Sequence, residues 1–387
     1  MLRVRTIHAR SAVSAVEYYT RYLTDAPGEI PGKWAGAQAA GLGLAGDVVA
    51  DDLLALLEGR DPRSGTRLGR AFIDRKLANG SVVKAVAGFD ATFSAPKSLS
   101  VLWALTRDPR LLDAHDVAVN ATLAHVERYG STTRVRVAGG RRLHPESQGL
   151  AIATFRQTTS REDDPQIHTH AVISSKVQTD DGRWLALDAR YLKKHQRVLG
   201  GLYQSVLRNE LTYRFGVDWG PIVKGQAEMS AMPDDLLAVF SKRSDQIDVA
   251  RAAKIAEFVA RQGRDPNRWE FGALKREAAV DTRGHKSGNG VPELMTRWDR
   301  EAADVGWTAL DLIDALEAQR IDPNERPPAI AVDELVDALS TSGSSWNRAQ
   351  IVGALTDLAR PDPSLSGEEW AARIEQWSDA VTAHGVE

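Results

Sequence analysis

One predicted strand constrains the fold most, because it carries two histidines. Residues 165–173 read Pro-Gln-Ile-His-Thr-His-Ala-Val-Ile, and this alternating, β-branched pattern predicts a β-strand. Side chains alternate along a strand, so His168 and His170 point to the same face and their rings can converge on one small object. A divalent metal ion is the usual object, but a lone His-x-His pair also arises by chance.

The neighbouring segments predict that this strand belongs to an antiparallel sheet with flanking helices, an α+β fold. Residues 149–158 and 166–178 read as strands joined by the polar loop 160–164. If they pair as a hairpin, Gln157 lies opposite His168. Further strands are expected at 82–93, 131–138 and 184–187, and helices at 11–23, 47–58, 96–105 and 110–129.

Composition limits the class of protein. The chain of 387 residues has no cysteine, which excludes disulfides, thiolate metal sites and cysteine nucleophiles. No apolar run reaches the roughly 18 residues of a membrane span, and no signal-peptide pattern begins the chain. We therefore expect a soluble, cytoplasmic protein.

Charge is distributed unevenly along the chain. Residues 1–300 carry 44 Lys and Arg against 35 Asp and Glu, a net charge of +9, whereas residues 301–387 carry 5 against 17, a net charge of −12. The basic part favours a polyanionic partner, and the alternative is an ordinary solvated surface. Beyond residue 328 helical patterns are expected at 332–340, 346–359 and 366–383. No Walker A sequence is present.

Two further groups of residues could carry chemistry. Asp90 falls on the polar face of strand 82–93, where a carboxylate can orient a metal-binding imidazole or accept a nucleophile's proton. A structural aspartate that bonds nearby backbone amides is the alternative. Tyr18 and Tyr22 share a face of helix 11–23 by their i, i+4 spacing, and Tyr19 is turned about 100° away. Phenols are poor nucleophiles without a nearby metal or base, and aromatic core packing is the alternative for each.

Several long motifs occur together in a fixed order. They are the paired Tyr18-Tyr19, then Trp34 and Gly36, then Gly-Phe-Asp-Ala-Thr-Phe-Ser-Ala-Pro-Lys-Ser at 88–98, Phe155-Arg156 with Thr159-Ser160-Arg161, Asp164 to Val172, and Asp281-Thr282-Arg283 with Lys286. In this combination residues 1–300 resemble the MobF-type conjugative relaxases of the HUH endonuclease superfamily.

The resemblance implies a fold and an activity. The fold would be a palm of antiparallel strands over about 1–230 with helical fingers over about 231–300. Residues 301–387 would form an acidic helical linker or the start of a helicase-type region. Such relaxases nick one DNA strand at the transfer origin of a plasmid, form a 5′-phosphotyrosyl adduct and later rejoin the strand. The alternatives are a non-catalytic origin-binding module with a degenerate metal site and a rolling-circle replication initiator. The long 92–98 motif argues against the initiator.

Partners and roles follow from the same resemblance. The partners would be single-stranded and hairpin DNA, relaxosome accessory proteins and a type IV secretion coupling protein. The protein would act as a monomer and accompany the strand into the recipient cell. Tyr18 would be the first nucleophile, Tyr19 its near rival and Tyr22 a candidate for a second strand transfer. Asp90 would accept a hydrogen bond from a metal-ligand histidine and help to deprotonate Tyr18.

One position departs from the family pattern. The family has a third histidine where this chain has Gln157, next to the pair His168 and His170. An amide oxygen can ligate Mg²⁺ or Mn²⁺ but is a weaker donor than imidazole for Zn²⁺ or Ni²⁺. Mg²⁺ or Mn²⁺ is therefore the favoured cofactor, Zn²⁺ or Ni²⁺ is possible, and a degenerate site is the competing interpretation. His144 is a remote substitute for the missing ligand.

Basic residues supply candidates for contact with DNA. In the motifs and the finger segment these candidates are Lys97, Arg156, Arg161, Arg276, Arg283 and Lys286. In residues 261–286 the cations are interleaved with Trp269 and Phe271, a composition that suits tracking of a backbone and stacking of a base. The alternative for any one of these residues is a solvated helix face.

Overall fold

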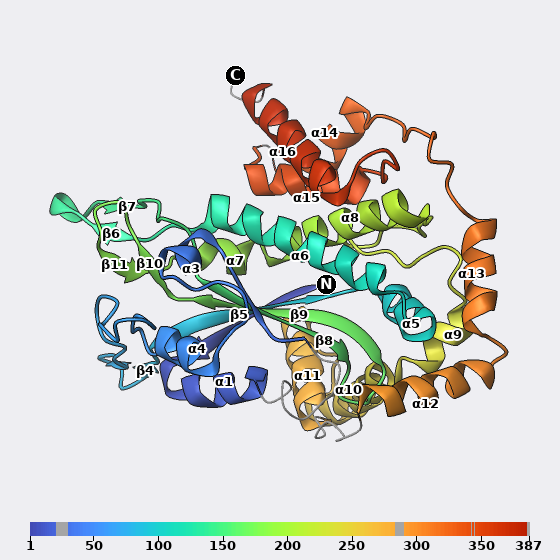
Figure 1. The fold of residues 1–387 in the computed structure, drawn as a ribbon. Coiled ribbons are helices and arrows are strands. Elements are labelled where there is room, and N and C mark those ends of the chain that lie inside the picture. Colours follow the sequence, from blue (N-terminus) through green and yellow to red (C-terminus); the bar gives the residue numbers. More distant parts are fainter. Residues whose placement is uncertain (21–29, 283–289, 342, 344, 385–387) are drawn as a thin grey trace.

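An antiparallel sheet of five strands forms the centre of the molecule (Figure 1). The computed structural model describes residues 1–20, 30–282, 290–341, 343 and 345–384. In the order in which they pair, the strands are β1 (Leu2–His8), β5 (Val86–Ser94), β9 (Pro165–Ser174), β8 (Ile152–Thr159) and β2 (Lys33–Ala35). The strand with the two histidines is therefore the central one, and the predicted α+β class is confirmed.

Helices cover both faces of this sheet. The long helices α6 (Pro109–Gly130) and α8 (Gln196–Phe215), with α5 (Lys97–Thr106), enclose the main core against Phe93 and Ile173. The other face is covered by α1 (Ala12–Thr20) and α4 (Ala50–Leu57), which pack on Phe155 and Val172. The predicted helices 47–58, 96–105 and 110–129 are present with shifted ends, and helix 11–23 is present over 12–20, with 21–23 outside the described residues. Two short helices, α3 (Ala37–Gly41) and α7 (Arg190–Lys194), complete the palm.

Several strand predictions were wrong in extent. Segment 82–93 is divided between β4 and β5, and 166–178 is divided at Ser175, whose amide donates to the carbonyl of Ala87. Segment 184–187 pairs with β10 outside the main sheet, and only 135–136 of the predicted strand 131–138 is extended in a ladder. The resulting two-stranded ribbons are β3 (Arg75–Lys76) with β4 (Val82–Val83), β6 (Val135–Arg136) with β7 (Arg142–Leu143), and β10 (Lys176–Gln178) with β11 (Trp184–Ala186).

The β1–β5 pairing contains a bulge that explains another difference. Ile7 pairs with Gly88 and His8 pairs with Val86, so Ala87 has no partner across the ladder. Ala87 therefore packs with the α1–α4 core, whereas Phe89, Ala91 and Phe93 face the main core as their alternation predicts.

A helical subdomain follows the palm. Its helices are α9 (Asp234–Val239), α10 (Lys242–Gln262), α11 (Arg268–Asp281) and α12 (Val291–Ala303). Helix α10 ends at Gly263 in the left-handed conformation, and α11 begins with a capping box between Asn267 and Glu270. The Lys254 ammonium bonds to Glu277 and Asp281, which ties α10 to α11 as an antiparallel pair.

The C-terminal helices return to the palm (Figure 1). They are α13 (Ala309–Ala318), α14 (Val332–Ser340), α15 (Arg348–Leu358) and α16 (Gly367–His384), and the last three confirm the predicted segments. Helices α15 and α16 pack on α8, and the buried Val352, Trp370 and Ile374 belong to the same core as the palm. None of the described helices is both long and apolar enough to cross a membrane.

Candidate metal and nucleophile site

The two histidines and Gln157 lie on one face of the β8–β9 hairpin. Gln157 pairs with His168 across the antiparallel ladder, as the hairpin prediction requires. The rings of His168 and His170 are 5.2 Å apart between centroids. Phe155, two residues before Gln157, packs with Tyr19 on the same face.

Both imidazoles are held through their Nδ1 atoms. The Nδ1 of His170 lies 3.0 and 3.1 Å from the carboxylate oxygens of Asp90, and the Nδ1 of His168 lies 2.8 Å from the carbonyl oxygen of Gln166. If each Nδ1 carries the proton that these acceptors require, each Nε2 presents a lone pair. This is the arrangement of a metal-ligating histidine that is oriented by a carboxylate or carbonyl. The Asp90 carboxylate therefore lies within hydrogen-bonding distance of the Nδ1 of His170, where the resemblance implies an acceptor.

Asp90 is buried within a set of donors. Burial alone would raise its pKa, but hydrogen bonds from His170, Tyr19 and Thr92 hold the pKa of Asp90 below its ordinary value. The hydroxyl of Thr92 lies 3.2 Å from Asp90 and 3.3 Å from the Nδ1 of His170. Asp90 is thus a carboxylate that stays ionised. Thr92 was missed by the sequence reasoning, although its place two residues after Asp90 on the same strand face indicated it.

The adjacent tyrosines differ in environment. Tyr19 is 5% exposed and stacks on Phe155 at 5.3 Å. Burial first, then the charge of Asp90 and the hydrogen bond to it, raises the pKa of Tyr19. Tyr18 is half-buried and meets His170 edge-on, with ring centroids 5.8 Å apart. Both phenols lie beside the candidate metal ligand, and Tyr18 is the more accessible. Tyr22 lies outside the described residues.

No third imidazole completes the site within the described ranges. There, no group of three or more His, Asp or Glu side chains comes together as a metal cluster. His144 lies elsewhere, 3.5 Å from Asp188 and beside Arg190, so it does not replace the missing ligand. Gln157 is 2% exposed and stands opposite His168, which makes its amide oxygen the available third donor. Two imidazoles and one amide oxygen form a donor set that fits a divalent metal ion.

The structure disperses the basic residues that the sequence grouped with the site. Arg156 points to the opposite face of the sheet and pairs with Asp116 of α6, so it is not brought to the histidines. The Lys97 ammonium donates to the carbonyl of Pro165 at 3.0 Å, and burial lowers its pKa. Arg161 is half-buried in the β8–β9 loop, and Arg276 is exposed on α11. Arg283 and Lys286 lie outside the described residues.

The β8–β9 loop makes contacts that sequence reasoning missed. Trp298 and Arg297 of α12 donate to the carbonyl of Asp163 at 2.7 and 2.9 Å. Lys242 of α10 lies 3.2 Å from Asp164. Helices α10 and α12 are therefore attached to the loop that joins the two strands of the site. No local pattern indicated this, because the partners are more than 70 residues away along the chain.

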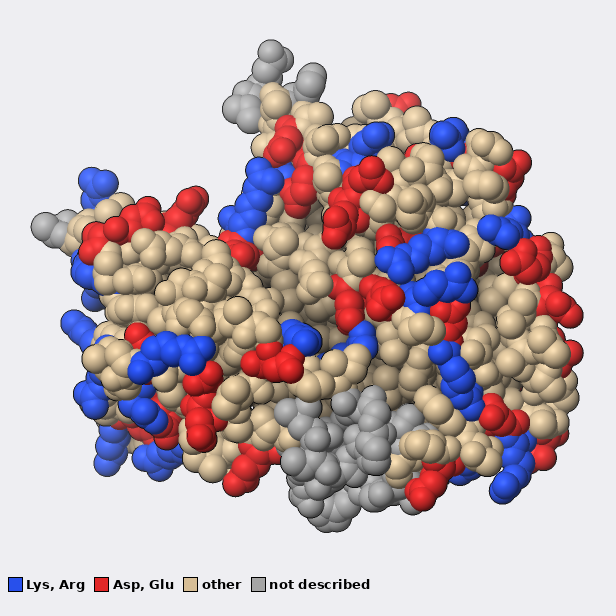
Figure 2. Space-filling view, viewed as in Figure 1, with Lys and Arg blue, Asp and Glu red and all other residues tan. Residues whose placement is uncertain are grey.

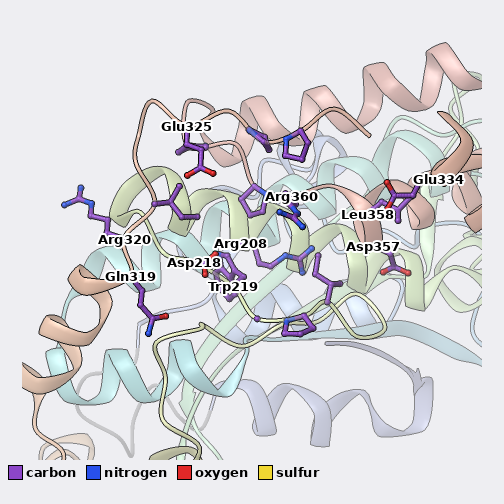
Figure 3. Close-up of a pocket in the computed structure, with 18 residues that line it drawn as sticks. Arg208, Asp218, Trp219, Gln319, Arg320, Glu325, Glu334, Asp357, Leu358 and Arg360 are labelled. Atoms are coloured by element: carbon purple, nitrogen blue, oxygen red, sulfur yellow. The ribbon is translucent and has the colours of Figure 1, made fainter. Parts of the chain in front are cut away.

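Exposed cations gather away from the core. Figure 2 shows Lys and Arg at one end of this face, over the region where Figure 1 places β4 and β11. The exposed cations of the nearby ribbons include Arg75, Lys76, Arg136 and Arg142. A cleft of about 800 Å³ between α8 and the C-terminal helices has mixed charge instead, with Arg208, Asp357 and Arg360 in its walls (Figure 3). None of the predicted site residues that the structure describes lines that cleft.

The sequence and the fold have counterparts in known proteins. A family model described as TrwC relaxase matches residues 4–305. The multifunctional conjugation protein TraI of Escherichia coli is 33% identical over 335 residues, which cover 83% of this chain. TraI from strain K12 is 34% identical over 336 residues and the same share of the chain. The chain spans only 17% of the length of each TraI relative.

Solved structures agree with the sequence relatives. The metal-free conjugative relaxase TrwC in complex with OriT DNA has a TM-score of 0.65 at 32% identity, covering 80% of this chain and all of that one. The metal-bound complex has a TM-score of 0.66 at 31% identity and the same coverage. TrwC with a 27-mer DNA that comprises the recognition hairpin and the cleavage site has a TM-score of 0.65 at 31% identity, again covering 80% of this chain and 100% of that one. From its motifs, its fold and these matches, the chain belongs to the TrwC relaxase family.

Proposed function

We propose that this chain is a DNA relaxase that nicks one strand at a transfer origin and later rejoins it. The observation that carries the proposal is the convergence of Tyr18, the pair His168 and His170, and the buried Asp90 on one sheet face. Metal-bound and DNA-bound TrwC structures share this fold, which supports the proposal for a homologous chain.

The chemistry assigns one role to each residue. The Tyr18 oxygen attacks the scissile phosphorus, the bond to the 3′ oxygen breaks, and the 5′ end stays on Tyr18 as a phosphotyrosine. Attack by a 3′ hydroxyl reverses the step without ATP, because one phosphodiester replaces another. The phenolic proton passes to solvent and the leaving 3′ oxygen takes a proton from solvent, since the lowered pKa of Asp90 makes it a weak base. Asp90 instead orients His170.

The metal would be held by His168, His170 and Gln157. A divalent ion bound there would polarise the non-bridging phosphate oxygens and offset the charge that develops in the transition state. With an amide oxygen as third ligand, Mg²⁺ or Mn²⁺ is favoured over Zn²⁺ or Ni²⁺.

The DNA partner would bind at two places. The exposed β3–β4 ribbon carries Arg75 and Lys76 and has the shape of an element that enters a duplex groove. The α10–α11 pair exposes Trp269 by 84% and Phe271 by 41%, which suits base stacking on single-stranded DNA. Relaxosome accessory proteins and a type IV coupling protein are the further partners we propose, with action in the cytoplasm before transfer.

One assay tests the function. The protein is incubated with single-stranded origin DNA and Mg²⁺, Mn²⁺, Zn²⁺ or Ni²⁺, and covalent adducts are separated on a denaturing gel. We expect an adduct with Mg²⁺ or Mn²⁺ that EDTA abolishes and that Tyr18→Phe lacks, while hairpin binding persists. The missing third imidazole favours a second candidate, a binding module that no longer cuts. Absence of an adduct with every ion, even after Gln157→His, would support that module and end the catalytic proposal.

A further inference from the structure

A chain of three buried polar groups lies behind the two histidines, on the face of β9 that α6 and α8 cover. Thr169 stands between His168 and His170 in the sequence and points to the opposite face. Its hydroxyl lies 2.8 Å from the Nε2 of His115 on α6, and the Nδ1 of His115 lies 2.8 Å from the hydroxyl of Tyr203 on α8. His115 and Tyr203 are fully buried and Thr169 is 3% exposed.

The next residue of α6, Asp116, contacts β8, the other strand of the hairpin. Asp116 pairs with Arg156 on β8, and Arg156 is the residue opposite Thr169 in the ladder. Two consecutive residues of α6 therefore contact the β8–β9 hairpin at the level of the histidines. These contacts therefore hold the hairpin on the sheet face opposite to the one that carries Gln157, His168 and His170.

These contacts specify the register of the hairpin. Burial, together with the charge of Arg156, lowers the pKa of His115 well below its usual value, so the ring stays neutral with one donor and one acceptor nitrogen. Both nitrogens are matched only while Thr169 occupies its present position. A slip of β9 by two residues would keep the same face inward, but it would bring Ile167 or Ala171 to this position and leave a buried imidazole nitrogen without a partner, which is costly. Burial of an apolar face alone would penalise such a slip less, because it does not require one particular residue beside His115.

We propose that Thr169, His115 and Tyr203 act as positioning residues for the metal site. They fix the backbone of β9 from behind, so that the rings of His168 and His170 meet at the spacing a divalent ion requires. The inference rests on the proposed function, because it assumes that these two histidines bind the ion. None of the three groups touches the ion or the DNA.

Matched variants at Thr169 separate positioning from packing. Thr169→Ser keeps the hydroxyl and loses a methyl group, whereas Thr169→Val keeps the branched shape and loses the hydroxyl. Mn²⁺ affinity is measured by isothermal titration calorimetry, and the midpoint of thermal unfolding is measured in EDTA. We expect Thr169→Val to weaken Mn²⁺ binding about tenfold, the lower end of the range for indirect support of a metal site. Thr169→Ser should stay within about twofold of the wild type.

Tyr203→Phe provides a second variant should Thr169→Val fold poorly. It removes one hydroxyl far from the ligands and should weaken Mn²⁺ binding about threefold, while the affinity for single-stranded DNA in EDTA stays unchanged. Lower unfolding midpoints for Thr169→Val and Tyr203→Phe with unaltered Mn²⁺ affinity would overturn the inference and leave a structural role. If the wild-type protein itself bound no Mn²⁺ and formed no adduct, the proposed function would fail first, and that result is distinct.

Discussion

At the scale of the residue, two adjacent tyrosines on α1 have the same side chain but differ in burial. Tyr19 is packed on Phe155 and donates to Asp90, and burial raises its pKa, so its ionised form is disfavoured. Tyr18 meets the edge of His170 and is partly open to solvent. The greater exposure of Tyr18 is the reason we propose it, and not Tyr19, as the nucleophile.

This difference predicts unequal effects of two substitutions. Tyr19→Phe removes only the hydrogen bond to Asp90, so adduct formation should persist within about tenfold of the wild-type rate, the scale of one lost hydrogen bond. Tyr18→Phe should form no adduct. Quenched time courses on denaturing gels measure both rates. Equal loss in the two variants would show that Tyr19 can replace Tyr18.

The proposed ligand Gln157 gives a second prediction at the same scale. Gln157→His supplies a third imidazole and should raise the affinity for Ni²⁺ or Zn²⁺ by at least about tenfold, because nitrogen donors suit these ions better than an amide oxygen does. Gln157→Leu has a similar volume and no donor, and it should weaken Mn²⁺ binding. Calorimetric titration of each ion gives the comparison. Unchanged Mn²⁺ affinity in Gln157→Leu would exclude the amide as a ligand.

At the scale of the element, helix α12 holds the loop between the two strands of the site. Arg297 and Trp298 both donate to the carbonyl of Asp163, a residue in the left-handed conformation with φ of 61°. A non-glycine residue in that conformation needs such support. Helix α12 thereby helps to define the shape of the β8–β9 turn.

Removal of this support should loosen the turn. Arg297→Ala loses the contact with Asp163, and amide hydrogen exchange in residues 160–164 should accelerate about fivefold, as expected for about 1 kcal/mol of lost local stability. Arg300→Ala, an exposed position on the same helix, is the control and should leave exchange unchanged. Exchange measured by mass spectrometry is the readout. Similar curves for both variants would mean that the loop is held by other contacts.

The β3–β4 ribbon makes a separate prediction. If Arg75 contacts a phosphate of duplex DNA, Arg75→Ala should lower the slope of log affinity against log salt by about 0.9, the value for one released counterion. Arg183→Ala is the control, because the Arg183 guanidinium is paired with Asp181 on the β10–β11 turn. Fluorescence anisotropy with a hairpin at several salt concentrations gives both slopes. A slope that does not change would place the duplex elsewhere.

At the scale of the whole molecule, one polar cluster fastens the C-terminal helices to the palm. Glu375 of α16 contacts His125 of α6 and Arg348 of α15, and it accepts a hydrogen bond from Tyr129 at 2.9 Å. Burial alone would raise its pKa, but these partners lower the pKa of Glu375 to about 2. Its ionised form therefore stabilises the docked arrangement.

The lowered pKa of Glu375 determines how the stability of the protein changes with pH. Because the folded pKa lies below the unfolded value of 4.5, the stabilisation is fully present above pH 4.5 and is lost as the pH falls towards 2. Glu375→Gln should lower the free energy of unfolding by about 2–3 kcal/mol at pH 7, and the difference should shrink in acid. Urea unfolding at several pH values measures it, with the exposed Glu368→Gln as control. A difference that is independent of pH would exclude the charge as its origin.

Much of the site was predictable because its information is local. Strand alternation places His168 and His170 on one face, and a short polar loop between two strands is enough to put Gln157 opposite His168. The predicted C-terminal helices also follow local periodicity. The strands β1 and β2 and the small ribbons were missed or misjudged, because their extension depends on partners distant in the sequence.

The sequence by itself determined which groups could do chemistry, and the tertiary structure decided which of them meet. Asp90 reaches His170 across 80 residues because β5 and β9 are neighbours, a pairing that no local pattern encodes. Arg156 was expected at the DNA, but strand alternation and the position of α6 place it behind the sheet with Asp116. The distinction between Tyr18 and Tyr19 likewise depends on burial. Burial and strand order arise from packing of the whole chain, so only the folded molecule shows them.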